Sequence, residues 1–432
     1  MDSKNTLIPL LVIGAHEKSE GYPNTLYRLR GLVESNLFDI TEINFPIRTT
    51  NAKKQWGFLR LIKAMLSAIY SHARILARYL KIVRPKFAYL PYPSTFLLFI
   101  FSLLPKKIRP GLLVADVFIS LYDTVVLDRA LFSKNSWVAK LLRWVERRAC
   151  NCADILVVDT EENKKFLCSL FKLSEAKVVA IPLATDEENF KFKPYQSDAD
   201  ACRVLFIGTL VPLHGIATIL EAIRLLSSDP RIHFKLIGDG QDAHLVEQWQ
   251  NQHGRIFEWE RKWQSSSQLA AEIARADICL GIFGHGDKTQ RVCPFKIYAY
   301  AAVGRPIITG HTEWLVNART YPGDEIIAGV AVNDPVALAK KISDLAMQPE
   351  ERIRLAKEAF YFYGAKLSNK LMLDLGRTII AFECNSRREA IDLLLARKWA
   401  VFSIDRLENY LAVPPALIDQ ISAVTQNLVR VE

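Results

Sequence analysis

The amino-acid sequence predicts an α/β protein made of two doubly wound domains, each a parallel sheet covered by helices. Short apolar segments alternate with segments of helical periodicity, and strands that alternate with helices form parallel sheets. The alternation is interrupted once, at the polar stretch 194–200, and then restarts. At 432 residues the chain is also too long for one ordinary core.

Each half of the chain contains six predicted strands. In the first half they are Leu7–Ile13, Phe38–Ile43, Phe87–Leu90, Leu112–Val117, Asp154–Val158 and Lys177–Ile181. In the second half they are Val204–Ile207, Phe234–Ile237, Ile256–Trp259, Asp277–Ile282, Pro306–Thr309 and Ile326–Val332. From Asp334 onward the pattern is helical. We therefore predict an N-terminal domain over 1–195, a second domain over 196–370 and a helical C-terminal extension over 371–432.

The positive charge of the chain is concentrated in one region. Residues 43–115 contain thirteen Lys and Arg and no Asp or Glu. The positive charge of this stretch alone exceeds the net charge of the whole chain, +10. Within it, the predicted helix Gly57–Leu80 is basic and amphipathic, which suits an anionic membrane surface. A half-buried helix with a solvated basic face is the alternative. No motif of a nucleic-acid-binding fold accompanies the charge, so we do not predict nucleic acid as a partner.

The cysteines and the N-terminus favour a cytoplasmic protein. Seven scattered cysteines lack metal-ligand spacing, which is typical of reduced thiols in the cytosol, and we see no secretory leader. The uncharged segment Phe87–Pro105 has nearly the length of a membrane span, but Pro91 and Pro93 interrupt it, so we predict a strand, a turn and a short helix. The expected location is cytoplasmic, peripheral at the inner face of the cell membrane.

The most informative segment is 277–306, which predicts a buried strand, a glycine-rich loop and a helix. Pro294 precedes the helix and Gly304 follows it, the usual arrangement at the two ends. Three cations surround the helix start: Lys288, Arg291 and Lys296. Because a helix N-terminus is already positive, these cations predict a bound anion, most commonly a phosphate. A solvated basic loop is the alternative.

Two further glycine turns follow strands of the second half. Gly208 and Gly215 frame a turn whose backbone amides could approach a phosphate, although a plain tight turn is equally compatible. Gly238 and Gly240 match a dinucleotide fingerprint, with Glu258 at the distance of a ribose ligand. That match is the basis for an NAD-dependent enzyme as an alternative.

In the first half, polar residues follow three of the predicted strands. Gly14 and His16 could form a substrate loop with acid–base capacity, with a solvated loop as the alternative. Asp116 lies at the carboxyl end of its strand and should point towards an interdomain cleft. Asp159 is expected to cap the helix Glu161–Leu170.

Taken together, these segments resemble a retaining glycosyltransferase of the GT-B fold, family 4 type. The sequence VLFIGTLVPLHGIATILEAIRLL resembles the strand, turn and helix that open the family's donor domain, and DKTQRVCPFKIYAYAAVGRPIITG resembles the donor-site helix of a subgroup. In the first half, VIGAHEKSEGYPNTLYRLRGL and DVFISLYDTVVLDR are also similar to family segments. The likeness covers about residues 7–371.

The resemblance implies transfer of a sugar, with retention, from a nucleoside diphosphate sugar to a glycan or lipid-linked acceptor, as in polysaccharide biosynthesis. No metal or other cofactor is expected, because cations and a helix dipole can stabilise the departing diphosphate. The three cations would hold the diphosphate, the glycines of the first turn would let the chain approach it, and Gly14 would lie near the sugar. We predict that His16 and Asp116 position the substrate.

Several positions depart from the pattern of the wider family, namely Thr209, His214, Arg291 and Ala299. The donor-helix Glu that binds the nucleotide ribose is replaced by Ala299, which should weaken nucleotide binding by about 1–3 kcal/mol. A catalytically degenerate member that acts as a glycan-assembly or sugar-nucleotide-binding module is therefore an alternative to the active enzyme. The resemblance argues against the NAD-dependent enzyme.

Overall fold

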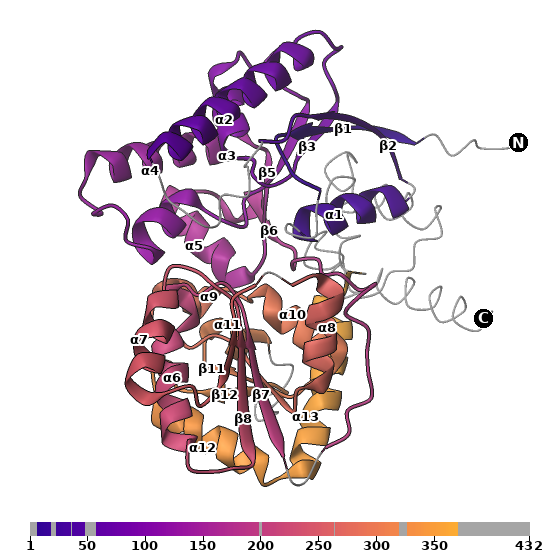
Figure 1. The fold of residues 1–432 in the computed structure, drawn as a ribbon. Coiled ribbons are helices and arrows are strands. Elements are labelled where there is room, and N and C mark those ends of the chain that lie inside the picture. The colour runs from indigo at the N-terminus through magenta and orange to yellow at the C-terminus, as the bar shows by residue number, and fades with distance from the viewer. Residues whose placement is uncertain are drawn as a thin grey trace, which may run out of the picture.

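The computed structural model describes residues 7–18, 23–35, 37–47, 58–197, 201–262, 264–318 and 326–369. It confirms the predicted fold class, with two six-stranded parallel sheets flanked by helices. Figure 1 shows the two sheets in separate domains that meet through the loops and helices between them. The predicted C-terminal extension, 371–432, lies outside the described residues.

The N-terminal sheet has the strand order β2-β1-β3-β4-β5-β6. Its strands are β1 (Ile8–Gly14), β2 (Phe38–Asn44), β3 (Phe87–Leu90), β4 (Leu112–Asp116), β5 (Ile155–Val158) and β6 (Val178–Ala180). Its helical elements are α1 (Pro23–Glu34), α2 (Phe58–Tyr79), α3 (Thr95–Leu103), the π-helical turn η1 (Asp123–Asp128), α4 (Trp137–Cys152), α5 (Glu161–Phe171) and η2 (Glu175–Lys177). β3, β4 and β5 are short and apolar, as expected for strands that are covered on both faces.

The second sheet has the strand order β12-β11-β10-β7-β8-β9. Its strands are β7 (Cys202–Ile207), β8 (Ile232–Ile237), β9 (Glu258–Glu260), β10 (Ile278–Leu280), β11 (Ile307–Gly310) and β12 (Ala328–Val330). Its helical elements are η3 (Pro212–His214), α6 (Ile216–Leu226), α7 (Ala243–His253), α8 (Ser266–Arg275), α9 (Asp287–Arg291), α10 (Phe295–Val303), α11 (Glu313–Ala318), α12 (Pro335–Ala346), α13 (Pro349–Phe362) and η4 (Tyr363–Leu367).

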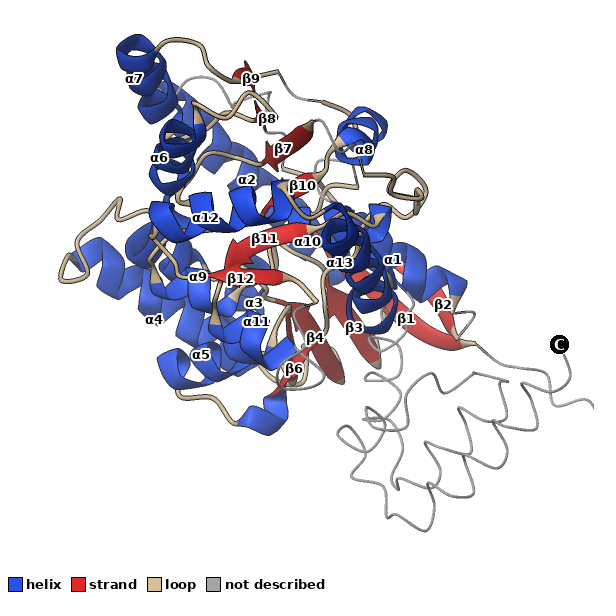
Figure 2. Cartoon of the chain, turned by 90° about the horizontal axis from the view of Figure 1, so that it is seen from below, coloured by secondary structure: helices blue, strands red, loops and turns tan. Residues whose placement is uncertain are grey.

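The second sheet is covered on both faces, which fixes where its strand ends point. One apolar core joins the sheet to α6, α7 and α12, and another joins it to α8, α10 and α13 (Figure 2). Because both faces are buried, the carboxyl ends of the strands and the loops after them are the available place for a ligand.

Local sequence signals set several of the helix ends. Ser136 caps α4 by accepting from the backbone N–H of Ala139, and Ser265 opens α8 with a reciprocal capping box. At α5 the prediction was wrong by one residue: Thr160 is the cap, and the Asp159 carboxylate accepts from Asn163 Nδ2 instead.

The predicted interruption of Phe87–Pro105 is confirmed, since this segment forms β3, a turn and α3. Among the described residues, no helix combines the length and apolar character that crossing a membrane requires.

Candidate donor site between the two sheets

The loops at the carboxyl ends of the two sheets contact each other. η1 follows β4 and α5 follows β5 in the N-terminal domain, and both contact α9, which follows β10 in the second domain. This arrangement brings the sequence-predicted donor segment against the other domain, as a site between two doubly wound sheets requires.

Lys296 is the central side chain of the donor segment. It lies in the first turn of α10, almost completely buried at 7% exposure. Its Nζ lies 3.7 Å from the centroid of the Phe206 ring and 3.4 Å from the carbonyl oxygen of Gly281, and no carboxylate of the described residues pairs with it. Burial lowers the pKa of Lys296 well below its usual value. A buried cation without a carboxylate is costly unless an anion binds beside it.

The turn after β7 supplies space next to Lys296. A methyl group on Gly208 would lie 2.7 Å from Lys296 Nζ and 2.9 Å from His214 Cε1, so only glycine leaves this space open. Gly215 has a φ of +63° and lies against the backbone of Phe283, which also excludes a side chain. The structure thus brings together three of the predicted site residues: Gly208, Gly215 and Lys296.

His214 is a polar group of this site to which the sequence analysis gave no role. Its ring is buried beside Gly208, and within the described structure Nδ1 has no hydrogen-bond partner. Burial, followed by the charge of Lys296, lowers the pKa of His214 well below its usual value, so the ring is neutral near pH 7. The single N–H of the neutral ring is used by a hydrogen bond to the Thr209 backbone, so Nδ1 faces this space as an acceptor.

Arg291 contacts the N-terminal domain instead of facing open solvent. Its guanidinium donates from Nη2 to Asp123 Oδ1 at 2.9 Å and from Nη1 to Asn163 Oδ1 at 2.9 Å, and it lies 3.5 Å from the centroid of the Phe166 ring. The Thr160 hydroxyl donates to the carbonyl oxygen of Arg291 at 2.6 Å. These contacts join α9 to η1 and α5.

Lys288 makes the same kind of contact. Its Nζ donates to Thr124 Oγ1 at 2.9 Å and lies 3.5 Å from Asp128 Oδ2. Two of the three predicted diphosphate ligands therefore have carboxylate partners in the other domain, a role that the sequence analysis did not foresee. That Lys288 and Arg291 bind the diphosphate stays a prediction. To do so, each would have to give up a carboxylate partner in the N-terminal domain.

On the N-terminal side, Gly14 and His16 lie together at the end of β1. His16 is fully buried; its Nε2 lies 3.0 Å from Glu42 Oε1, and a methyl group on Gly14 would lie 3.0 Å from His16 Nδ1. His16 Nδ1 has no hydrogen-bond partner in the part of the chain that is described. Glu42 also accepts from Lys18 Nζ at 2.6 Å. His16 is thus held by one nitrogen, and its other nitrogen is available to a ligand.

His16 should give the protein a measurable acid sensitivity. Burial lowers the pKa of His16 from 6.5 to about 4, although the interaction with Glu42 opposes this shift. The unfolded chain then binds more protons between these two values, so stability is complete above pH 6.5 and falls as the pH approaches about 4. We expect a loss of about 3 kcal/mol from this group.

Denaturant titrations at about pH 7.5 and about pH 4 would measure this loss. His16→Gln keeps a donor towards Glu42 but does not titrate, and it should lose about 3 kcal/mol less than the parent protein over the same interval. Equal losses in the two proteins would contradict the assignment.

Asp116 is placed differently from its sequence-based expectation. Its carboxylate is fully buried and pairs with Arg28, whose Nη1 lies 2.6 Å from Asp116 Oδ2. The Phe118 backbone N–H and the Asn24 side chain also donate to it, at 3.3 and 3.4 Å. Burial raises the pKa of Asp116, and Arg28 opposes that shift. These contacts indicate a group that fixes the loop after β4; a role in substrate positioning stays a prediction.

The dinucleotide-like motif has a structural explanation in this fold. A methyl group on Gly238 would lie 1.8 Å from the carbonyl oxygen of Gly208, and one on Gly240 would lie 2.4 Å from that of Leu210. These glycines allow two neighbouring loops to pack closely, so the motif no longer requires a dinucleotide.

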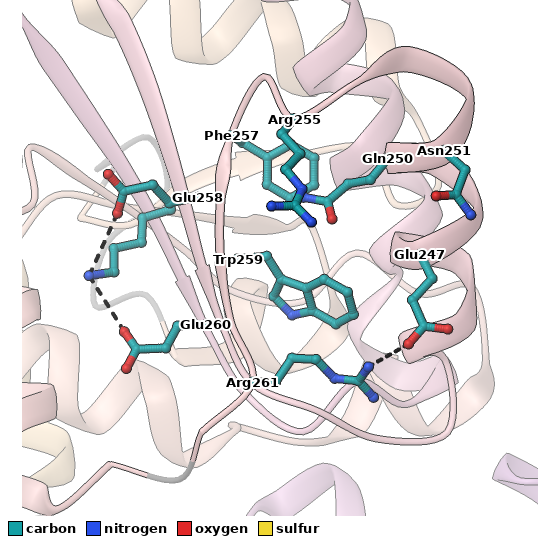
Figure 3. Close-up of a pocket in the computed structure, with 10 residues that line it drawn as sticks. Glu247, Gln250, Asn251, Arg255, Phe257, Glu258, Trp259, Glu260 and Arg261 are labelled. Atoms are coloured by element: carbon teal, nitrogen blue, oxygen red, sulfur yellow. Dashed lines mark hydrogen bonds and ion pairs between the residues drawn. The ribbon is translucent and has the colours of Figure 1, made fainter.

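A separate hollow of about 800 Å³ lies at the β9 edge of the second sheet (Figure 3). None of the residues predicted for the sugar-donor site lines it, although Glu258, the ribose ligand expected for an NAD-dependent enzyme, does. Several of its charged side chains pair with one another, as Lys235 does with Glu258 and Arg261 with Glu247. Within the described residues, no group of three or more His, Cys, Asp or Glu could hold a metal ion.

Comparison with known proteins agrees with this geometry. Residues 201–348 match the family model described as "Glycosyl transferases group 1". The fold resembles sucrose-phosphate synthase from Thermosynechococcus elongatus, with a TM-score of 0.64 and 15% identity over 86% of this chain and 98% of that chain. No curated protein sequence matches the chain.

Two further solved structures share the fold. HepE from Anabaena, in complex with UDP and glucose, has a TM-score of 0.59 and 13% identity over 86% of this chain and 99% of that chain. A mutant of TarM from S. aureus, in complex with fondaparinux, α-GlcNAc-glycerol and UDP, has a TM-score of 0.53 and 12% identity over 71% of this chain and 58% of that chain.

The two sheets and their facing carboxyl ends are those of the GT-B architecture. The residues that match the group 1 glycosyltransferase model lie in the second domain. Together, the domain match and the fold support a transferase and give no support to the NAD-dependent alternative.

Proposed function

We propose that this protein transfers a sugar, with retention, from a nucleoside diphosphate sugar to a glycan or lipid-linked acceptor. The observation that carries the proposal is Lys296, a buried cation that has no carboxylate partner among the described residues and adjoins the space left by Gly208. A diphosphate in that space would offset the cost of burying the lysine. It would also lie at the N-terminus of α10, where the helix dipole favours a negative charge.

The chemistry we propose is electrostatic and does not require a metal. As the bond between the sugar and the diphosphate breaks, negative charge grows on the leaving diphosphate, and Lys296 stabilises it where water is excluded. Gly14 and the free nitrogen of His16 would face the sugar from the other domain, with Asp116 holding the neighbouring loop. Lys288 and Arg291 would reach the diphosphate by exchanging a carboxylate partner for a phosphate oxygen.

The donor base and the acceptor are proposed from chemistry and from the likeness of fold. HepE binds UDP and glucose, and the TarM mutant binds UDP and α-GlcNAc-glycerol, which supports testing UDP-sugars first. Ala299 is buried in α10 and offers a methyl group where a ribose acceptor is expected, so we propose weak recognition of the ribose. The basic stretch 43–115 supports an association with the inner face of the membrane, and hence an acceptor presented there.

A panel of UDP- and GDP-sugars tests the donor proposal by thermal shift and by slow release of nucleoside diphosphate. A ligand that binds only the folded state stabilises it by about 2.7 kcal/mol at a concentration 100 times its Kd. We expect at least one donor to raise the melting temperature and to release its diphosphate.

The same assays on Lys296→Met should show neither effect, and Lys357→Met, on the surface of α13, should behave like the parent protein. Absence of both effects with every donor would contradict the proposed function.

A further inference from the structure

Three helices of the N-terminal domain expose large apolar side chains in one area. On α4 the exposed residues are Trp137, Leu141 and Trp144, at 74%, 49% and 53% exposure. Their spacing of four and three residues places them on one face of the helix. Isolated exposed apolar residues are ordinary, but a stripe with two exposed tryptophans needs an explanation.

The stripe continues onto the neighbouring helices. Phe99 of α3 contacts Trp144 of α4, with ring centroids 5.7 Å apart, and Phe96 of α3 contacts His72 of α2 at 6.2 Å. Figure 1 draws α2, α3 and α4 on the same side of the N-terminal domain. Further exposed apolar residues on α2 and α3 are Met65, Leu66, Ile69, Tyr70, Phe96 and Leu103. We call the exposed surface of these three helices the α2–α4 face.

The charge of the α2–α4 face has one sign. Exposed basic residues on these helices and the loops after them include Arg74, Arg78, Lys81, Arg84, Lys106, Lys107, Lys140 and Arg147. Residues 43–115 contain no acid, and from Arg129 to Ala153 the only acid is Glu146. Glu146 is buried, where it accepts from the backbone N–H groups of Leu121 and Tyr122. The face therefore offers apolar and cationic groups without exposed carboxylates from these segments.

We propose that the α2–α4 face docks on an anionic lipid bilayer, with Trp137, Leu141 and Trp144 inserted at the interface. Tryptophan is favoured at the boundary between headgroups and acyl chains, and the surrounding cations match anionic headgroups. A second copy of the chain would bring this positive surface against an identical one, which disfavours self-association through it. The inference goes beyond the basic stretch 43–115, because α4 lies outside that stretch and supplies the apolar stripe.

Vesicle sedimentation with the full chain tests the proposal, using phosphatidylcholine alone or mixed with phosphatidylglycerol. We expect binding to the mixed vesicles only, and binding that weakens as salt screens the charges. Trp137→Ser combined with Trp144→Ser should reduce binding by at least about tenfold, since both side chains leave the interface. Lys140→Glu combined with Arg147→Glu should reduce it by more than about fivefold for each charge removed.

Matched controls come from the other domain. Tyr361→Ser changes a side chain of α13 that is 68% exposed, and Lys357→Glu changes an exposed lysine of the same helix; neither should alter vesicle binding. Equal binding by all variants, equal binding to neutral vesicles, or dimerisation in solution that depends on Trp137 and Trp144 would each overturn the proposal. The assay contains no sugar donor, so its failure and a failure of the proposed donor chemistry are distinguishable.

Discussion

Lys296→Met should abolish donor binding while it makes the unliganded protein more stable. In the proposed site Lys296 is the only one of the three predicted phosphate cations without a carboxylate partner among the described residues. Its removal takes the principal positive charge away from the diphosphate, and we expect turnover to fall by about 100- to 1,000-fold, the cost of losing one transition-state donor. Methionine fills nearly the same volume against Phe206 without the cost of a buried charge.

The pH dependence of stability separates this explanation from a merely structural role. Burial lowers the pKa of Lys296 in the folded protein, so the unfolded chain binds more protons between that lowered value and about 10.4. The stability of the parent protein should therefore rise with pH across this window, and that of Lys296→Met should rise less. A bound diphosphate has the opposite influence on Lys296, because its negative charge raises the pKa of the lysine. The protein should therefore take up protons when the donor binds.

Thermal melts at several pH values and calorimetry in buffers of different ionisation enthalpy would measure these changes. Lys357→Met, at an exposed position on α13, is the control and should match the parent protein in all respects. The explanation would be wrong if Lys296→Met bound the same donors, or if it were less stable than the parent protein at neutral pH.

Sequence patterns predicted the elements of the fold because burial on both faces of a parallel sheet leaves a strong local signal. The predicted helix Gly57–Leu80 corresponds to α2, and Pro294 and Gly304 flank α10 as expected. A short edge strand leaves a weaker local signal, and the strand predicted at Ile256–Trp259 is β9, Glu258–Glu260. The π-helical turn η1 has no periodicity of its own and was not predicted.

The donor site was only partly visible in the sequence. Gly208 and Lys296 are close because the segments after β7 and β10 leave adjacent strands of one sheet, which strand order in a doubly wound domain can suggest. The partners of Arg291, namely Asp123 and Asn163, come from a different domain more than a hundred residues away. Such a contact depends on how two domains meet, and no local pattern encodes it.

The pairing of Asp116 with Arg28 also joins distant parts of the chain, and so no local pattern predicted it. The position of Asp116 at the end of a strand suggested the cleft, but its partner, Arg28, lies in α1, a helix in which no site residue was predicted. A carboxylate at the end of a strand faces either a ligand or a buried cation, and only the packing of α1 decides between them. The contacts of Arg28 therefore define the most direct test of what Asp116 does.

Arg28→Met should be the most destabilising single substitution that we propose, with a loss of about 3–5 kcal/mol. Both side chains of the ion pair are buried, and Arg28 Nη2 also donates to the carbonyl oxygen of Ile181 at 2.8 Å, beyond the end of β6. Removing the guanidinium leaves the Asp116 carboxylate in the interior with long contacts, from the Phe118 backbone N–H at 3.3 Å, Asn24 at 3.4 Å and Tyr89 at 3.5 Å. Denaturant titration at neutral pH would measure the loss.

The double variant Arg28→Met/Asp116→Asn should recover most of that stability, because no buried charge is left without a partner. Its activity then decides the role of Asp116. If the double variant is stable, binds donor and still transfers sugar, Asp116 serves the fold through Arg28. If it is stable and binds donor but no longer transfers sugar, the carboxylate acts on the substrate, as the strand-end position first suggested. Failure of the double variant to recover stability would show that the ion pair itself, and not the unpaired charge, holds β4 and the segment after β6 together.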